Sequence, residues 1–144
     1  MASKDWKTFL IPYEQAVEEL KVKLRAIRTE YRRKNDYSPI EFITGRVKEV
    51  SSMLEKANKF GIPHDRLAEE LEDIAGIRIM VQFVDDIETV VQLLRGRSDM
   101  RILYEKDYIT NVKPSGYRSY HMIIEYPVNM ASGVVNVIGE IQIR

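Results

Sequence analysis

The chain has 144 residues, of which 44% are hydrophobic and 31% charged, a composition that predicts one globular domain and argues against disorder. Lysine plus arginine number 22, as do aspartate plus glutamate, so the net charge is zero and a general polyanion binder is disfavoured. The sequence has no cysteine, which excludes disulfides and thiol catalysis, and no apolar run approaching about 18 residues, which argues against a membrane span. The expected compartment is the cytoplasm, with neither a membrane nor DNA as a partner.

Residues 6–33 are expected to form a long amphipathic helix, because apolar residues recur there at steps of three and four. Pro12 falls early in this segment and is an alternative starting point for the helix. Basic residues recur with the same spacing and define a second face, the basic stripe: Lys21, Arg25, Arg28 and Arg32. Either solvated charge or an anion site explains the basic stripe, and the spacing alone leaves both open.

Short elements and breaks follow the long helix. A turn-rich connector over residues 34–39 leads into an alternating strand expected at residues 40–44, and Gly45 then allows a sharp exit from the strand. Farther on, residues 61–63 break the chain, and Asp65 is expected to cap a short helix.

The helix expected near residues 50–60 carries a candidate phosphate site. Lys48, Ser52 and Lys56 are spaced four apart, which places them on one helical face. With Arg46, they form a polar set suited to a triphosphate. A plain surface helix would also carry lysines, but the order of strand, Gly-Arg-x-Lys and helix favours a ligand.

Two acidic strands provide the central chemical hypothesis. In residues 72–80 a loop feeds a buried strand, with Asp73 at its mouth as a metal-type ligand and Arg78 along it as an anion clamp. Taken alone, this stretch also fits a helix-end aspartate and a salt-bridged arginine. The strand expected at residues 134–144 repeats the design, with Glu140 before an Ile-x-Ile alternation and an arginine. Side by side, the two strands would hold two carboxylates over one Mg²⁺, which is suited to phosphoryl transfer.

A helix capped by Asp85 or Asp86 is expected after the central strand, with its buried stripe beginning at Ile87. Another strand is expected at residues 100–104. The helix between them leaves enough chain for the two strands to run parallel, as a right-handed βαβ unit.

The last two strands are expected at residues 117–126 and 134–144, joined by a hairpin-like turn over residues 127–133. Side chains alternate between the faces of a strand. Alternation therefore places three functional candidates on one face of the last strand: Glu140, Gln142 and Arg144.

The run Lys-Pro-Ser-Gly-Tyr-Arg-Ser-Tyr-His at residues 113–121 resembles the signature of RelA/SpoT-type alarmone synthetase domains. Three further motifs follow the family's order: Gly45-Arg46-x-Lys48, Asp73-Ile74-Ala75-Gly76-Ile77-Arg78 and Glu140-Ile141-Gln142-Ile143-Arg144. The first helix and residues 38–42 look most like the small, single-domain synthetases. The resemblance implies that residues 1–144 form one synthetase domain without the C-terminal helical segment with which family members continue.

The resemblance implies an α/β (α+β) fold, a nucleotidyltransferase-like mixed β-sheet flanked by helices. It also implies a Mg²⁺-dependent GTP diphosphokinase that transfers the β,γ-pyrophosphate of ATP to the 3′-hydroxyl of GDP or GTP, giving ppGpp or pppGpp plus AMP. The alternative on the same fold is a catalytically weak nucleotide- or RNA-binding module, in which single-stranded RNA would use the basic stripe and an aromatic platform.

The resemblance assigns roles to individual residues. Asp73 and Glu140 would hold Mg²⁺, and Glu140 would also take the proton from the 3′-hydroxyl. ATP would be bound by Arg46 and Arg78 at the adenine and by Lys48, Ser52 and Lys56 at the triphosphate. GDP or GTP would be bound by Tyr117 at the guanine and, at the phosphates, by Lys106, Lys113, His121, Gln142 and Arg144. Some of these have simpler alternatives, since Tyr117 could be a core residue, His121 a hydrogen-bonded strand residue and Arg144 a charged chain end.

Small synthetases of this type assemble as tetramers and bind a product-like alarmone between subunits. The resemblance therefore suggests a homotetramer and gives the basic stripe a use. We expect a regulatory anion site at Lys21, Arg25 and Arg28, with Glu41 and Thr44 nearby.

Overall fold

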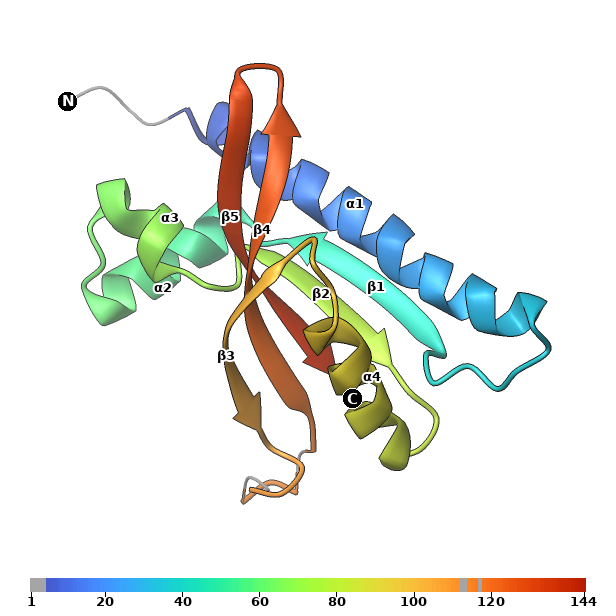
Figure 1. The fold of residues 1–144 in the computed structure, drawn as a ribbon. Helices are drawn as coiled ribbons and strands as arrows, with labels where there is room; N and C mark the ends of the chain where they lie inside the picture. Colours follow the sequence, from blue (N-terminus) through green and yellow to red (C-terminus); the bar gives the residue numbers. More distant parts are fainter. Residues whose placement is uncertain (1–4, 112–113, 117) are drawn as a thin grey trace.

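A five-stranded mixed sheet organises the computed structural model, which describes residues 5–111, 114–116 and 118–144 (Figure 1). The elements in chain order are α1 (Trp6–Arg33), β1 (Phe42–Val47), α2 (Val50–Phe60), a 3-10 helix (His64–Arg66), α3 (Leu67–Glu70), β2 (Ala75–Met80), α4 (Asp85–Arg95), β3 (Arg101–Asp107), β4 (Tyr120–Met130) and β5 (Gly133–Ile143). The strand order is β1-β2-β5-β4-β3, and only β2 and β5 pair in parallel. The expected mixed sheet with a long N-terminal helix is confirmed.

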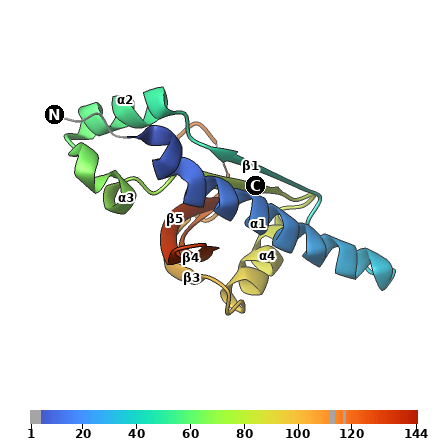
Figure 2. The same ribbon diagram turned by 90° about the horizontal axis from the view of Figure 1, so that it is seen from above.

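The long helix α1 has the predicted bounds. Asp5 caps it, since its carboxylate accepts a hydrogen bond from the Thr8 N–H, and Pro12 lies inside the helix rather than at its start. The apolar stripe packs against the sheet through Tyr13, Ala16, Val17, Leu20 and Leu24, all buried. The C-terminal end of α1 extends past the sheet (Figure 2). Among the described residues, no helix is both long and apolar enough to cross a lipid bilayer.

The sheet has one buried face and one open face. Along β2, Ala75, Ile77 and Ile79 are buried, whereas Arg78 between them is exposed. The same alternation along β5 buries Val137, Ile141 and Ile143 and confirms the predicted division of that strand. The buried face belongs to the core that α1 and α4 complete, so the polar side chains of both strands gather on the other face.

Gly45 lies within β1, paired with Ile77, and the predicted exit from the strand at this glycine is wrong. A Cβ built on Gly45 would lie 2.8 Å from Val17 Cγ1 on α1, closer than such atoms pack. The glycine therefore marks the close approach of the long helix to the strand.

Two predicted helix caps are also wrong in position. Asp65 lies inside the 3-10 helix, which begins after Pro63 without a side-chain cap. The N-cap of α4 is Val84. Asp86, one residue into α4, instead accepts hydrogen bonds from the Phe83 N–H at 3.2 Å and the Tyr37 hydroxyl at 2.7 Å.

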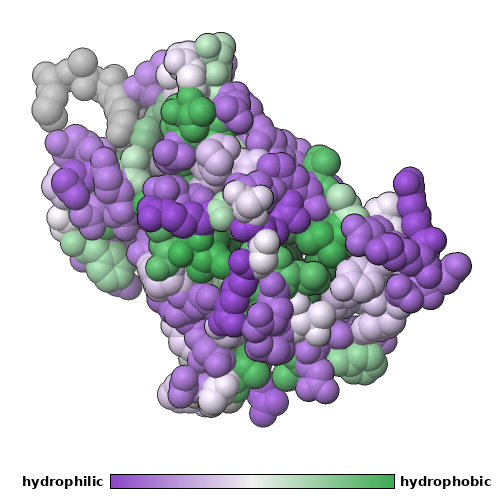
Figure 3. All heavy atoms as spheres, in the orientation of Figure 1, coloured by the Kyte–Doolittle hydropathy of each residue, from purple (hydrophilic) through white to green (hydrophobic). Residues whose placement is uncertain are grey.

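The β4–β5 hairpin is longer than the sequence indicated. Met130 pairs with Gly133, which leaves a two-residue turn, and Pro127 lies within β4 opposite Asn136. The turn predicted over residues 127–133 is therefore wrong, because most of that segment pairs with β5 instead. The face of the molecule in Figure 3 is largely hydrophilic, with hydrophobic spheres over this hairpin, where Val134 is 60% exposed.

The strands flanking α4 run in the same direction, as predicted, but are not neighbours in the sheet. β5 and β4 lie between β2 and β3. β5 pairs in parallel with β2, whereas β4 pairs antiparallel with both β5 and β3. This insertion of β5 beside β2 brings together the two acidic strands identified in the sequence.

Candidate active site

The open face of the sheet carries a row of polar residues contributed by all five strands. Each member is the register partner of the next. In sheet order the row is Thr44, Arg78, Gln142, His121 and Lys106. A shorter parallel row consists of Arg46, Gly76 and Glu140. Because register partners share a face, side chains distant in sequence meet over one surface.

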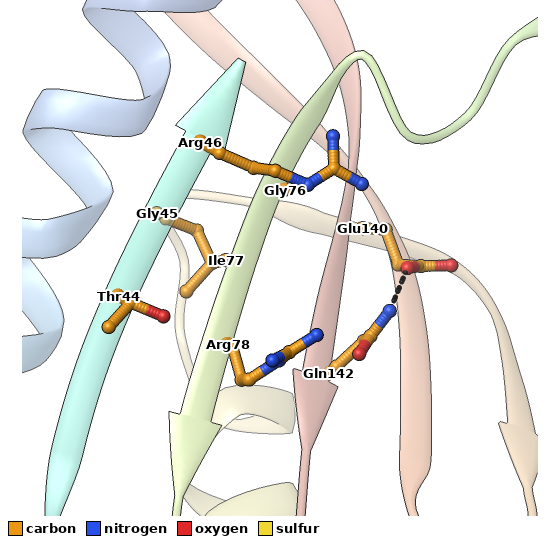
Figure 4. Close-up of a pocket in the computed structure, with 8 residues that line it drawn as sticks. All are labelled: Thr44, Gly45, Arg46, Gly76, Ile77, Arg78, Glu140 and Gln142. Carbon is orange, nitrogen blue, oxygen red and sulfur yellow. Dashed lines mark hydrogen bonds between the residues drawn. The ribbon is translucent and has the colours of Figure 1, made fainter. Parts of the chain in front are cut away.

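Part of these rows lines a pocket of about 170 Å³ (Figure 4). Its lining residues are Thr44, Gly45, Arg46, Gly76, Ile77, Arg78, Glu140 and Gln142. Arg46 extends across Gly76, where a Cβ would lie in ordinary contact with Arg46 Cγ at 3.8 Å. Arg46 and Arg78, both exposed, therefore present two planar guanidinium groups to the same pocket.

Asp73 lies in the loop just before β2 and joins two lysines. Its Oδ2 accepts a hydrogen bond from Lys48 Nζ at 3.1 Å, and its Oδ1 lies 3.3 Å from Lys56 Nζ. The carboxylate is largely buried, with 16% of the side chain exposed. Burial works to raise the pKa of Asp73, but the hydrogen bond from Lys48 and the charge of Lys56 together hold this pKa below its ordinary value. Asp73 is therefore ionised at neutral pH.

The predicted helical face of Lys48, Ser52 and Lys56 is wrong for its first member. Lys48 precedes α2, whose N-cap is Glu49, and its N–H donates to the carbonyl of Ile74. Lys48 and Lys56 nevertheless converge on Asp73 from the two sides of this cap. Ser52 is half-buried in the first turn of α2.

Glu140 is held by two neighbours on the open face. Gln142 Nε2 donates to Glu140 Oε1 at 2.7 Å, and His121 Nδ1 lies 3.6 Å from Glu140 Oε2. The interaction with His121 is the main reason that the pKa of Glu140 falls below its ordinary value, against the effect of burial. The negative charge of Asp73 acts in the opposite direction on this pKa. The carboxylate in the loop before β2 thus acts electrostatically on the one on β5.

The carboxylates of Asp73 and Glu140 suit a Mg²⁺ ion whose coordination shell is completed by the substrate. Asp73 Oδ1 is buried and faces the Lys56 ammonium at 3.3 Å, a cation position that Mg²⁺ could take over once Lys56 turns to a phosphate. The described part of the chain contains no cluster of three or more histidine, cysteine, aspartate or glutamate side chains suited to a metal. Mg²⁺ is commonly bound by one or two carboxylates, with water and substrate phosphates completing its shell, so two carboxylates are adequate.

The acceptor side of the site is defined by fewer contacts. The Lys106 ammonium lies 5.5 Å from the centre of the Tyr104 ring, and Lys106 pairs with His121 in the sheet. Arg144 extends the pairing of β5 with β2, because its N–H donates to the Ile79 carbonyl. Lys113 and Tyr117, predicted for guanine nucleotide binding, lie outside the described residues.

The basic stripe lies on α1, and its residues do not line the pocket. Lys21 pairs with Glu18 on its own helix at 2.9 Å. Arg25 donates to the Ile43 carbonyl at 3.1 Å, and the Arg28 guanidinium lies 6.0 Å from the centre of the Phe42 ring. Arg25 and Arg28 therefore lean toward β1, while Thr44 of the same strand faces the pocket.

Sequence reasoning missed two interactions beside the site. The Tyr104 hydroxyl donates to Glu72, which connects β3 to the loop that carries Asp73. Ser119 is fully buried and bonds to His121. Glu72 adjoins Asp73, and Ser119 lies inside the motif at residues 113–121, so both belong to segments that the sequence singles out. Their hydrogen-bond partners are evident only in the folded chain.

The chain is similar to known proteins in both sequence and structure. Residues 45–144 match the family described as a region found in RelA / SpoT proteins. The chain is 55% identical over 144 residues to GTP pyrophosphokinase YjbM of Bacillus subtilis (strain 168), covering 100% of this chain and 68% of the relative. The structure of small alarmone synthetase 1 from Bacillus subtilis bound to its product pppGpp is 54% identical with a TM-score of 0.93, covering 99% of this chain and 73% of that chain. A structure of that synthetase bound to AMPCPP has 49% identity and a TM-score of 0.86, over 99% and 70% of the two chains.

Proposed function

The chain belongs to the RelA/SpoT family, and we propose that it is a (p)ppGpp synthetase, a GTP pyrophosphokinase that uses ATP and GDP or GTP as substrates. The observation that carries this proposal is the pair of charged carboxylates, Asp73 and Glu140, beside a pocket lined by two arginines. Transfer of a phosphoryl-type group depends mainly on alignment and charge neutralisation, which this arrangement supplies.

The ATP side of the proposal uses the pocket and the two lysines. Arg46 and Arg78 would hold the adenine between their guanidinium planes, a stacking contact that lysine does not reproduce. Lys48 and Lys56 already face a carboxylate, so they are positioned to turn toward phosphate oxygens of similar charge. Ser52, in the first turn of α2, would add a hydroxyl donor.

Asp73 and Glu140 would hold Mg²⁺, which when bound neutralises charge on the transferred phosphates. Glu140, kept ionised by its neighbours, would accept the proton of the 3′-hydroxyl. The 3′-oxygen then bonds to the β-phosphorus of ATP as the bond from that phosphorus to the α,β-bridging oxygen breaks. AMP leaves with the bridging oxygen, and the pyrophosphate remains on the guanine nucleotide.

The acceptor phosphates would be surrounded by residues at the far end of the polar row and at the end of β5. The described members of this group are Lys106, His121, Gln142 and Arg144. Lys113 and Tyr117 complete the proposed set, with Tyr117 stacking on the guanine.

The test is incubation with Mg²⁺, GDP and ATP labelled at the γ-phosphate, followed by thin-layer separation. We expect label to appear in the guanine nucleotide together with an equal amount of AMP, and Glu140→Gln to abolish both. Retention of single-stranded RNA without any label transfer would instead support the nucleic-acid-binding module. Asp65→Asn, a similar loss of charge on an exposed residue, is the control.

We propose further that the protein is a homotetramer with a regulatory anion site on the basic stripe. The observation that supports the anion site is at Arg28, whose Nε is buried without a hydrogen-bond partner among the described residues. An alarmone phosphate near Lys21, Arg25 and Arg28 would satisfy it. Replacing Lys21 and Arg25 by alanine should remove activation by added pppGpp, whereas the same change at the exposed Lys7 should not. Activation that survives the double change would exclude this site.

A further inference from the structure

Ser119 is a buried hydroxyl that the proposed reaction does not use. Its side chain is 0% exposed, and its Oγ lies 2.8 Å from His121 Nε2. Its carbonyl accepts a hydrogen bond from the Tyr108 N–H at 2.9 Å, which fixes the backbone just before β4. Burial of a hydroxyl is costly unless it is hydrogen-bonded, so this contact with the imidazole has a structural reason to persist.

The other nitrogen of the same imidazole faces the proposed base. His121 Nδ1 lies 3.6 Å from Glu140 Oε2, and 12% of the His121 side chain is exposed. The edge-on ring of Tyr108, with its centre 5.1 Å away, packs against the imidazole. Ser119, His121 and Glu140 therefore form a continuous series of contacts from the residue just before β4 to the carboxylate.

The contacts of the ring favour one form of the neutral imidazole, because the Ser119 hydroxyl can donate or accept whereas the Glu140 carboxylate only accepts. When the Ser119 hydroxyl donates to Nε2, the ring proton must be on Nδ1, where it points toward Glu140. In the other tautomer, a lone pair on Nδ1 would face a negatively charged oxygen. A neighbour that fixes the tautomer of a functional histidine also fixes the direction in which the ring donates.

We propose that Ser119 is a positioning residue that turns the Nδ1–H of His121 toward Glu140 and so orients the carboxylate that accepts the 3′-hydroxyl proton. The inference rests on the proposed function, because it assigns Ser119 a role only through Glu140. Ser119 touches neither substrate in the proposed reaction, so its loss should lower kcat more than it raises KM for ATP.

The kinetic test compares Ser119→Ala with Ser119→Cys, which keeps a weak donor in a similar volume, and with Ser132→Ala at the exposed hairpin turn as the control. We expect Ser119→Ala to lower kcat by about 10- to 100-fold, as losses of such supporting contacts typically do, with KM for ATP within about twofold. Ser119→Cys should fall between the alanine variant and the wild type. A kcat of Ser119→Ala within about twofold of wild type would overturn the proposal. If Ser119→Ala does not fold, a folded Ser119→Cys with a kcat within about twofold of wild type would overturn it instead.

The spectroscopic test uses the fact that the chain has only two histidines. Nitrogen NMR at pH 9 should show His121 as the Nδ1–H tautomer in the wild type and a displaced Nε2 resonance in Ser119→Ala, where this acceptor nitrogen loses its donor, with His64 as the internal reference. A wild-type Nε2–H tautomer would overturn the proposal. Failure of the wild type to transfer label would refute the proposed function instead, and the tautomer result would still stand separately.

Discussion

Replacing Asp73 by asparagine removes one charge with almost no change in volume, and the structure sets the size of the effect on stability. The attraction between Asp73 and Lys48 at 3.1 Å is about 5 kcal/mol before desolvation, for an effective dielectric constant of about 20. Burial offsets most of this attraction, since both side chains are 16% exposed. Lys56, 39% exposed, adds a smaller share. We expect the free energy of unfolding to fall by about 1–2 kcal/mol.

The same substitution should have a much larger effect on the reaction. Asp73 is one of the two carboxylates proposed to hold Mg²⁺, and loss of electrostatic stabilisation of this kind costs about 3–4 kcal/mol, or roughly 10²- to 10³-fold in rate. The assays are AMP formation from ATP and GDP and unfolding in urea. Asp65→Asn, in the exposed 3-10 helix, should change neither quantity.

The pH dependence gives a separate check on the ion pairs. The pKa of Asp73 is lower in the folded chain, so its stabilising contribution is fully present above the ordinary carboxyl pKa and is lost as the pH falls through the folded value. The stability difference between wild type and Asp73→Asn should therefore shrink below about pH 4. Equal stabilities at pH 7 would refute the ion-pair reasoning, and a folded variant with a rate within about threefold of wild type would refute the metal assignment.

Three further predictions concern packing, an ion pair and the nucleotide pocket. Gly45→Ala should lower the urea midpoint by the equivalent of about 1–3 kcal/mol, because its Cβ would overlap Val17, whereas Gly76→Ala, with 3.8 Å of room, should change it little. Asp99→Asn should cost about 1 kcal/mol at pH 7 after allowance for screening. The pKa of Asp99 is lowered to about 2 mainly by Arg97, so this difference should vanish between about pH 4 and pH 2. Arg46→Lys should raise KM for ATP and leave KM for GDP nearly unchanged, in steady-state measurements with each substrate varied.

Local patterns predicted the elements with the longest regular repeats. The bounds of α1 and α2 agree with the expected 6–33 and 50–60, because periodicity over several turns and a terminal Gly61 are signals contained in the segment itself. The division of β5 into an apolar and a polar face followed in the same way from strict alternation. The residues of the candidate site came from these faces and from the resemblance to a family.

The predictions that were wrong depend on neighbours distant in sequence. Gly45 suggested a chain exit, and only the crossing of α1 at Val17 explains why a glycine is needed there. Pro127 suggested a turn, but pairing with Asn136 keeps it in a strand. Lys48 fitted a helical spacing that the cap at Glu49 interrupts. In each case, tertiary contacts outweighed a local preference.

The pairing of β2 with β5 is what unites the candidate site. Its register sets Gly76 beside Glu140 and Arg78 beside Gln142. Because side chains alternate, a shift of this register by one residue would turn the polar face of β5 into the core. The buried Ile77 and Ile141, partners in the same register, oppose such a shift through their apolar contacts. The core that stabilises the sheet therefore also keeps Glu140 on the same open face as Arg46 and Arg78.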